Sequence, residues 1–187
     1  ETRRKLLENA GVIPEIITAN IDETEIKQSL VSEGATPPHI AETLAEHKAT
    51  TVSRKNLGRI VVGADQVLAF RGRVYSKPAT ENIGRDQLLS LRGETHQLFS
   101  SACVAVNGER VWHYTGEANM TVRHFSQGFI EDYLAKTGEK VLLSPGGYQL
   151  EGLGAQLFEK VEGDYFTILG LPLLPLLKFL RDRGVLA

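Results

Sequence analysis

The sequence predicts an α/β protein with a mixed β-sheet. Runs of β-branched and apolar residues, such as Ile60 to Val62, are typical of buried strands. Segments with an apolar residue every three or four positions, such as residues 37–55, predict amphipathic helices. The Asn107-Gly108 turn joins two of the expected strands as a hairpin. Because neighbouring strands joined by hairpins run antiparallel, the sheet cannot be an all-parallel, doubly wound one.

Length and composition are those of an ordinary globular protein. The chain has 187 residues, of which 42% are hydrophobic and 24% charged, and its net charge is −2. We predict one domain spanning residues 1–187, with further N-terminal sequence, including a strand, before Glu1. The small negative charge gives no reason to expect a nucleic-acid partner. No membrane span or signal peptide is recognisable, so the expected location is cytoplasmic.

The only cysteine, Cys103, lies within an apolar run. A disulfide within the chain is therefore excluded, and we expect a buried, unreactive thiol.

The N-terminal segment is expected to form a helix over residues 2–10, with Gly11 after its end. Arg3 and Arg4 fall in the first turn of this helix. They are either a surface pair or part of an anion site, where guanidinium groups and backbone N–H groups bind one phosphate.

A strand is expected from Ile13 to Thr18, and Glu23 follows it. Acids in such positions usually cap or form turns, although Glu23 could also be a metal ligand. Pro37-Pro38 opens the helix of residues 37–55. Lys48 lies on the apolar stripe of this helix, so its ammonium must reach the rim or an anion.

The segment from Arg59 to Pro78 is predicted to be a hairpin that presents two charges. Gly63 allows a close approach of the backbone, and Asp65 is expected at the end of the first strand. Lys77 stands before the turn at Pro78. The two charges could hold a metal and a phosphate together, or they could be solvated on a surface hairpin.

The C-terminal half alternates between helices and strands. A glycine-rich loop covers residues 145–154, and it lacks the Gly-Lys-Ser/Thr of a Walker loop. The other expected elements are a helix at 80–92, strands at 97–106, 109–114 and 120–124, a helix at 126–137, a strand at 155–161 and a final helix from Leu171.

Eight short motifs in order resemble the Maf family of nucleoside triphosphate pyrophosphatases. Together they cover nearly the whole chain, and Leu91-Arg92-Gly93 departs from the family pattern by carrying arginine for serine. The motifs are Arg3-Arg4-Lys5-Leu6-Leu7, Asp22-Glu23, Leu44 to Ala49, Gly63-Ala64-Asp65, Lys77-Pro78, Leu91 to His96, Gly163-Asp164-Tyr165 and Gly170-Leu171-Pro172-Leu173.

The resemblance implies hydrolysis of the α–β phosphoanhydride of a nucleotide to a monophosphate and pyrophosphate, with a divalent metal. It implies an elongated α/β fold with a cleft between two lobes, similar to the inosine-triphosphate pyrophosphatases, and a homodimer is compatible with it. Asp65 is the expected general base, and Glu23 and Asp65 are the expected ligands of Mg²⁺ or Mn²⁺. The expected phosphate-binding residues are Arg3, Arg4, Lys48 and Lys77.

Three positions are expected to affect base choice. Asp65-Gln66 and Leu150-Glu151-Gly152 resemble the corresponding motifs of the family members that prefer 7-methyl-GTP. Glu151 suits a cationic methylated guanine because a carboxylate accepts N–H bonds and offsets the charge. Thr2 stands where that group has a tryptophan. We predict a 7-methyl-GTP pyrophosphatase, and the alternative substrates are dTTP and UTP.

Two other functions are compatible with the sequence. A non-catalytic nucleotide-binding regulator on the same fold would bind nucleotide without turnover. Single-stranded nucleic-acid binding through Arg3 and Arg4 is disfavoured by the acidic balance and the scattered aromatic residues.

Overall fold

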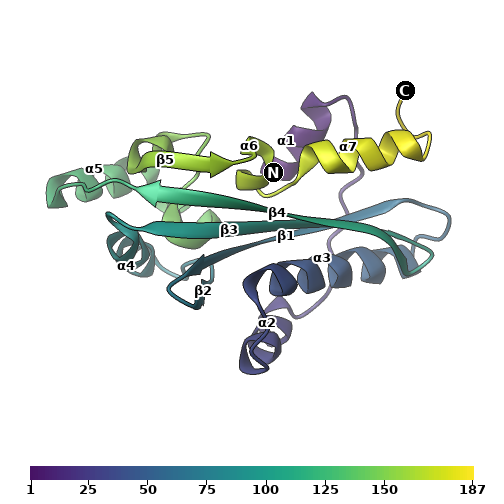
Figure 1. The fold of residues 1–187 in the computed structure, drawn as a ribbon, viewed down its shortest axis with the longest axis horizontal. Helices are drawn as coiled ribbons and strands as arrows, with labels where there is room; N and C mark the ends of the chain where they lie inside the picture. Colours follow the sequence, from purple (N-terminus) through teal and green to yellow (C-terminus); the bar gives the residue numbers. More distant parts are fainter. The chain divides into compact units, whose positions relative to one another are not determined.

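The computed structural model describes residues 1–187, and the chain divides into two compact units. Unit 1 comprises residues 1–66, 99–117 and 164–187, and unit 2 comprises residues 67–98 and 118–163. Both units contain parts of the three long strands of one five-stranded sheet (Figure 1). The strands are β1 (Val61–Phe70), β2 (Arg73–Tyr75), β3 (Thr95–Val106), β4 (Glu109–Val122) and β5 (Phe158–Gly163).

The sheet has the strand order β2-β1-β3-β4-β5. At its two edges β2 pairs antiparallel with β1, and β5 pairs antiparallel with β4. The predicted α/β class, with helices beside the sheet, is confirmed. The helices are α1 (Thr2–Asn9), α2 (Glu23–Ser32), α3 (Pro37–Arg54), α4 (Glu81–Leu91), α5 (Gln127–Thr137), α6 (Tyr165–Ile168) and α7 (Leu173–Asp182).

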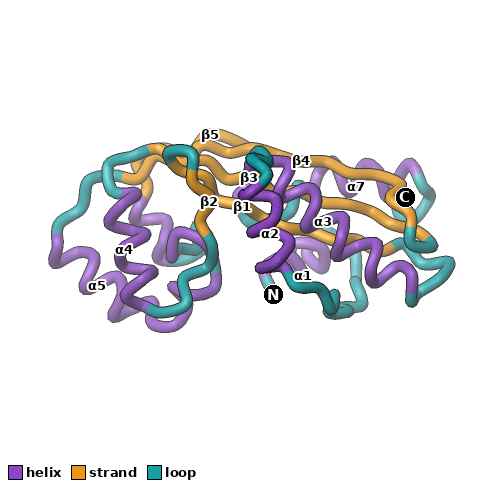
Figure 2. The backbone as a smooth tube through the Cα atoms, turned by 90° about the horizontal axis from the view of Figure 1, so that it is seen from below, coloured by secondary structure: helices purple, strands orange, loops and turns teal.

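Unit 1 has helices on both faces of its part of the sheet. Side chains alternate between the two faces of a strand. On β3, Ala102 and Val104 pack with residues of α1 and α7, whereas Cys103 and Ala105 pack with Ala45 and Ala49 of α3. Figures 1 and 2 show α3 running beside the strands. Burial on both faces explains why this segment of β3 is continuously apolar.

The core packing also decides the state of Cys103. Its side chain is fully buried, and burial raises the pKa of the thiol to about 12. The predicted burial of this thiol is confirmed. None of the helices combines the length and the apolar character needed to cross a membrane.

Unit 2 is built around α4 and α5, which contact each other beside its part of the sheet (Figure 2). Short 3₁₀ turns at Gly138–Leu143, Pro145–Gly147 and Leu153–Leu157 follow α5. His96 and Tyr148 lie in the interior of this unit.

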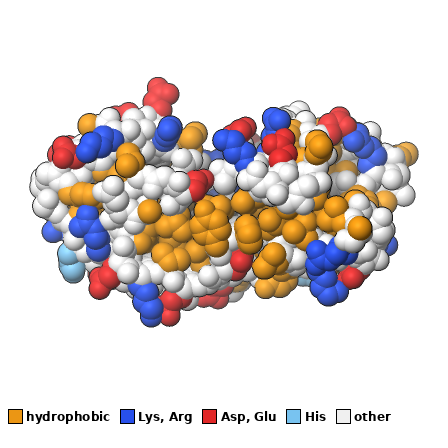
Figure 3. Space-filling model, turned by 90° about the horizontal axis from the view of Figure 1, so that it is seen from above, with side chains coloured by type: hydrophobic (Ala, Val, Ile, Leu, Met, Phe, Trp, Pro, Cys, Tyr) orange, Lys and Arg blue, Asp and Glu red, His pale blue; other side chains and the backbone are white.

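Hydrophobic side chains are also exposed on the side of unit 1 that carries α7 (Figure 3). They line an open groove between this helix and β4, and Trp112 packs against Phe179 there.

Several sequence predictions were wrong in detail. No strand forms at residues 13–18, where Ile13 is 88% exposed, because no burial stabilises an extended segment there. The helix α2 was not predicted. The two expected strands at 109–114 and 120–124 are one continuous strand, β4. The last strand begins at Phe158 after a 3₁₀ turn, and the last helix begins at Leu173.

Candidate active site

Two carboxylates lie around one lysine ammonium in unit 1. Lys48 Nζ donates to Asp65 Oδ1 at 2.6 Å and lies 2.8 Å from Glu23 Oε2. The side chains of Asp65 and Lys48 are only 12% and 16% exposed, whereas that of Glu23 is 53% exposed. The cluster is therefore buried at Asp65 and open to solvent at Glu23.

A close approach of β1 to α3 brings Asp65 to Lys48. A Cβ atom at Gly63 would lie 2.3 Å from Ala45 O and 2.6 Å from Ala49 N, so glycine is required for this contact. Asp65 is two residues further along the same face of β1 and so faces α3 as well. The predicted close approach at Gly63 is confirmed, but Asp65 lies within the strand and not at its end.

Glu23 reaches the cluster from the first turn of α2. The Asp22 side chain caps this helix by accepting a hydrogen bond from Glu25 N at 2.9 Å. The Asp22-Glu23 pair thus has two roles, a cap and a cluster carboxylate.

Arg3 joins α1 to the backbone beside Asp65. Its Nε donates to Gly170 O and its Nη1 donates to Ala64 O, both at 2.8 Å. Burial lowers the pKa of the Arg3 guanidinium below its ordinary value, and the negative charges of Asp65 and Glu23 oppose this shift. Arg3 is therefore within electrostatic reach of both carboxylates.

Gln66, next to Asp65, holds α6 in place. Its Nε2 donates to Ser100 Oγ at 3.0 Å and to Ile168 O at 2.9 Å. Ser100 Oγ also donates to Thr167 O at 2.7 Å, and Asp164 caps α6 through Thr167 N. The amide nitrogen of Gln66 is thus used within the protein, which leaves its Oε1 as the atom best suited to contact a ligand.

Lys27 is a further cation near Asp65, and the sequence analysis missed it. It lies one helical turn after Glu23 on α2, and its side chain is half-buried. Burial lowers the pKa of Lys27, and the charge of Asp65 opposes this shift. The spacing of four residues between Glu23 and Lys27 would have identified it, had α2 been predicted.

The remaining predicted site residues come from α1 and from unit 2. Arg4 is half-exposed on α1 and pairs with Glu8 at 2.7 Å. Thr2 is the first residue of α1. Lys77 is exposed after β2 in unit 2, and Glu151 is exposed in a turn of the same unit. Their roles stay predictions.

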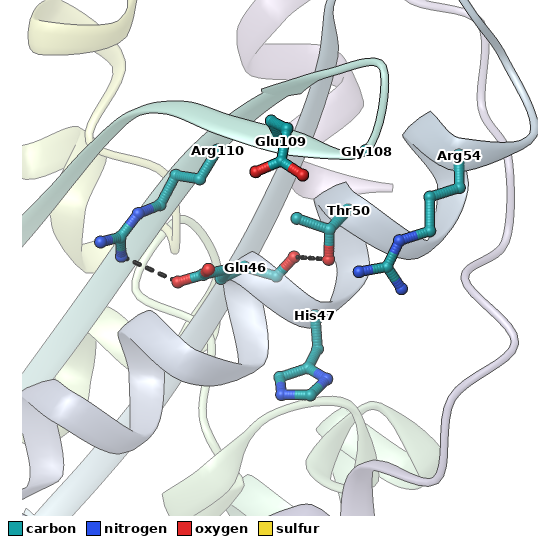
Figure 4. A pocket seen from close by; sticks show the side chains of 7 residues that line it. All are labelled: Glu46, His47, Thr50, Arg54, Gly108, Glu109 and Arg110. Atoms are coloured by element: carbon teal, nitrogen blue, oxygen red, sulfur yellow. Dashed lines mark hydrogen bonds and ion pairs between the residues drawn. The ribbon is translucent and has the colours of Figure 1, made fainter.

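A polar hollow of about 430 Å³ lies on the other side of α3 in unit 1 (Figure 4). Glu46, His47 and Arg54 line it from the helix, and Arg110 lines it from β4. Arg110 is paired with Glu46 at 2.8 Å and with Glu42 at 2.7 Å. None of the predicted site residues contributes to this hollow.

Comparison with known proteins decides the family. Residues 1–183 match the family model described as Maf-like protein. The chain belongs to the Maf family. The residues gathered around Lys48 therefore come from four Maf motifs that are far apart in the sequence.

Several individual bacterial proteins are similar to this chain over almost their whole length. A nucleoside triphosphate pyrophosphatase of Paramagnetospirillum magneticum is 48% identical, over 98% of this chain and 95% of the relative. A 7-methyl-GTP pyrophosphatase of Rhizobium meliloti is 50% identical, over 98% of this chain and 92% of the relative. One of Brucella suis with the same name is 47% identical, over 96% and 90%.

Proposed function

We propose that this protein is a nucleoside triphosphate pyrophosphatase, which hydrolyses the α–β phosphoanhydride to a nucleoside monophosphate and pyrophosphate. The observation that carries the proposal is the cluster in which Lys48 lies between Asp65 and Glu23. Arg3 lies within electrostatic reach of both carboxylates. Relatives with the names nucleoside triphosphate pyrophosphatase and 7-methyl-GTP pyrophosphatase support the proposal.

Asp65 is proposed as the general base. Lys48 holds Oδ1 of this carboxylate, and Oδ2 would accept a proton from the attacking water. The water oxygen then bonds to the α-phosphorus while the bond from this phosphorus to the α–β bridging oxygen breaks and pyrophosphate leaves. Lys48 and Arg3 would offset the negative charge of the phosphate oxygens.

Glu23 and Asp65 fit a divalent metal such as Mg²⁺ or Mn²⁺. They are two carboxylates that face a single ammonium, and Mg²⁺ is typically bound by one or two carboxylates together with substrate phosphates. No group of three or more His, Cys, Asp or Glu side chains is arranged to hold a metal by itself. The metal would therefore bind with the substrate, and it would supply positive charge to the phosphate oxygens.

For the nucleobase of the substrate, we propose 7-methylguanine rather than a pyrimidine. The two relatives from Rhizobium meliloti and Brucella suis carry the name of this substrate, and this chain has the Gln66 and Glu151 of the matching motifs. Gln66 would act through Oε1 or by holding α6, since its nitrogen is occupied. Thr2, Arg4 and Lys77 keep their proposed roles in base choice and phosphate binding. The homodimer and the cytoplasmic location stay predictions.

A pyrophosphate-release screen tests this proposal. The purified protein is incubated with 7-methyl-GTP, GTP, dTTP and UTP, with Mg²⁺ or Mn²⁺, and pyrophosphate and orthophosphate are measured separately. We expect metal-dependent release of pyrophosphate, and 7-methyl-GTP to be preferred over GTP. Binding without turnover under either metal would support the non-catalytic regulator instead, and a preference for dTTP or UTP would reject the proposed base.

A further inference from the structure

The geometry points to Lys27 as a further phosphate-binding residue of the site, acting on the phosphate chain of the substrate. The inference rests on the proposed function, because it assigns a ligand group to the same cluster of charges. It adds a residue of α2 that lies outside the eight motifs found in the sequence.

The helix α2 directs Lys27 toward the cluster. Residues four apart on a helix lie on the same side, one turn from each other. Glu23 and Lys27 have this spacing, and the Glu23 carboxylate reaches to within 2.8 Å of Lys48 Nζ. The side of α2 that faces Lys48 therefore also carries Lys27.

Burial separates Lys27 from the other charged residues of α2. Glu23 and Glu25 are exposed, whereas Lys27 is half-buried. A half-buried lysine covers its apolar stem and directs its ammonium to solvent or to an anion. The charge of Asp65 acts on Lys27, which places the ammonium within electrostatic reach of the proposed general base.

The balance of charge favours an anionic ligand. The cluster contains two carboxylates, Asp65 and Glu23, and Lys27 joins Lys48 and Arg3 as a third cation. A bound triphosphate would add several negative charges to this cluster. Offsetting them requires cations beyond those that neutralise Asp65 and Glu23.

A lysine suits this task chemically. Its ammonium is a compact point charge on a flexible stem, so it can follow phosphate oxygens as the substrate is cleaved. Hydrogen bonds between an ammonium and a phosphate are charge-assisted and stronger than neutral ones. The competing possibility is that Lys27 only offsets the charge of Asp65 and Glu23 and does not contact substrate.

Kinetics of Lys27→Met and Lys27→Arg distinguish these two roles. For Lys27→Met with Mg²⁺, we expect the KM for the triphosphate to rise about tenfold or more, since a charge-assisted bond is lost. Product inhibition by inorganic pyrophosphate should weaken in parallel, because that product keeps the phosphate chain. Inhibition by the nucleoside monophosphate should change less. Lys27→Arg, which keeps the charge, should recover most of the affinity.

Lys178→Met is the matched control. Lys178 is an exposed lysine of α7 in an i,i+4 pair with Asp182, so its loss should leave KM and pyrophosphate inhibition unchanged. If Lys27→Met keeps the wild-type KM and pyrophosphate inhibition, the inference is overturned, whatever the change in melting temperature. If Lys27→Met fails to fold, Lys27→Gln replaces it in calorimetric titration with inorganic pyrophosphate. Weaker binding that Lys27→Arg largely restores supports a direct contact, and unaltered binding in Lys27→Gln overturns it.

Failure of the proposed function would look different. In that case the wild-type protein would release no pyrophosphate from any triphosphate, and the Lys27 variants would have no activity to lose. Direct calorimetric titration with inorganic pyrophosphate would still test Lys27, because it requires no turnover.

Discussion

The two units differ in the charge and the solvent exposure of their inward-facing polar side chains. In unit 1, Asp65, Lys48 and Glu23 are charged, and the cluster opens to solvent at Glu23. In unit 2, His96 is 1% exposed and bonds through Nε2 to the hydroxyl of Tyr148 at 2.6 Å. Burial lowers the pKa of His96 to about 4, so this pair is neutral at physiological pH.

The second pair fixes a loop. Tyr148 belongs to the glycine-rich segment 145–154, and its ring and that of His96 both contact Phe158. Tyr133 donates to Gly147 O at 3.2 Å in the same segment. The hydroxyls of Tyr133 and Tyr148 and Nε2 of His96 are bonded inside the protein, as expected for groups that fix a backbone.

This difference indicates that the charged cluster of unit 1 serves catalysis, whereas the neutral pair of unit 2 serves stability. A partly buried ion pair adds little net stability, because desolvation cancels much of the attraction. We therefore expect substitutions in the charged cluster to act mainly on turnover. Substitutions at His96 and Tyr148 should act mainly on the free energy of unfolding.

Asp65→Asn should have the largest effect. The amide cannot accept the proton of the attacking water, so kcat should fall by about 10²–10⁴-fold. The melting temperature should stay close to that of the wild type, since the side chain keeps its shape and Lys48 keeps Glu23 as a partner. Pyrophosphate release and differential scanning calorimetry on the same preparation measure both quantities.

Asp182→Asn is the control for this substitution. Asp182 is an exposed carboxylate of α7 that pairs only with Lys178 among the ion pairs described. Its loss should leave kcat unchanged. Normal turnover in Asp65→Asn would remove Asp65 from the mechanism and break the contrast between the two units.

Gly63→Ala should affect both stability and activity. The added methyl group would meet backbone atoms of Ala45 and Ala49, so α3 must move away from β1. We expect a loss of about 1–3 kcal/mol in the free energy of unfolding. We also expect a clear fall in kcat, because Lys48 moves with α3 and displacements of about 1 Å can be costly to catalysis.

Gly58→Ala provides the comparison for Gly63→Ala. Gly58 has φ +74° and no atom within 4 Å of an added Cβ, so the cost is backbone strain of about 1–2 kcal/mol without a displacement of α3. Denaturant unfolding and steady-state kinetics of both variants should show that only Gly63→Ala loses turnover. An active Gly63→Ala protein would mean that the contact of β1 with α3 does not position Lys48.

The same glycine shows where sequence reasoning succeeded and failed. The close approach at Gly63 was predicted, but the strand was expected to end at Asp65 and instead continues to Phe70. Gly116 is a second example, since β4 was expected to end before it. A Cβ at Gly116 would lie 2.5 Å from Thr167 Oγ1, so this glycine admits a neighbouring side chain and does not break the strand.

Local signals explain which helices were predicted. The Pro37-Pro38 start of α3, and Ser126 and Gly138 at the two ends of α5, are visible in the sequence. The helix α2 has no buried residue, and its apolar stripe is short, with Ile26 and Leu30 as the only pair at helical spacing. Missing this helix meant missing Lys27.

The candidate site was predicted in part. Arg3, Glu23, Lys48 and Asp65 were found through the family motifs, and the structure brings them together. The two hydrogen bonds that Arg3 makes to distant backbone carbonyls could not be predicted. They depend on Gly170 and Ala64, which meet Arg3 only in the folded chain.

Acid should destabilise the protein through His96. Burial holds its pKa at about 4 in the folded state, below the ordinary value of 6.5. Between pH 6.5 and 4, His96 is therefore protonated in the unfolded chain but not in the folded chain. The free energy of unfolding falls as the pH drops through this range. The full effect is up to about 3 kcal/mol.

A difference measurement isolates this effect from the titration of carboxylates. Urea unfolding of the wild type and of His96→Asn is compared at pH 7 and pH 4.5. The variant should lose less stability between the two values than the wild type. His39→Asn, at an exposed position, should behave as the wild type. Equal losses in the wild type and His96→Asn would show that His96 does not govern acid sensitivity.

Tyr148→Phe should have the smallest effect. It removes the hydroxyl that bonds His96 Nε2, and Nδ1 of this histidine already lacks a partner within its buried site. The loss of one neutral hydrogen bond should lower the free energy of unfolding by about 1 kcal/mol, and kcat should be unchanged. Tyr114→Phe, at an exposed position of β4, should change neither quantity. A large fall of kcat in Tyr148→Phe with unaltered stability would place this tyrosine in the chemistry, and the division of roles between the two units would no longer hold.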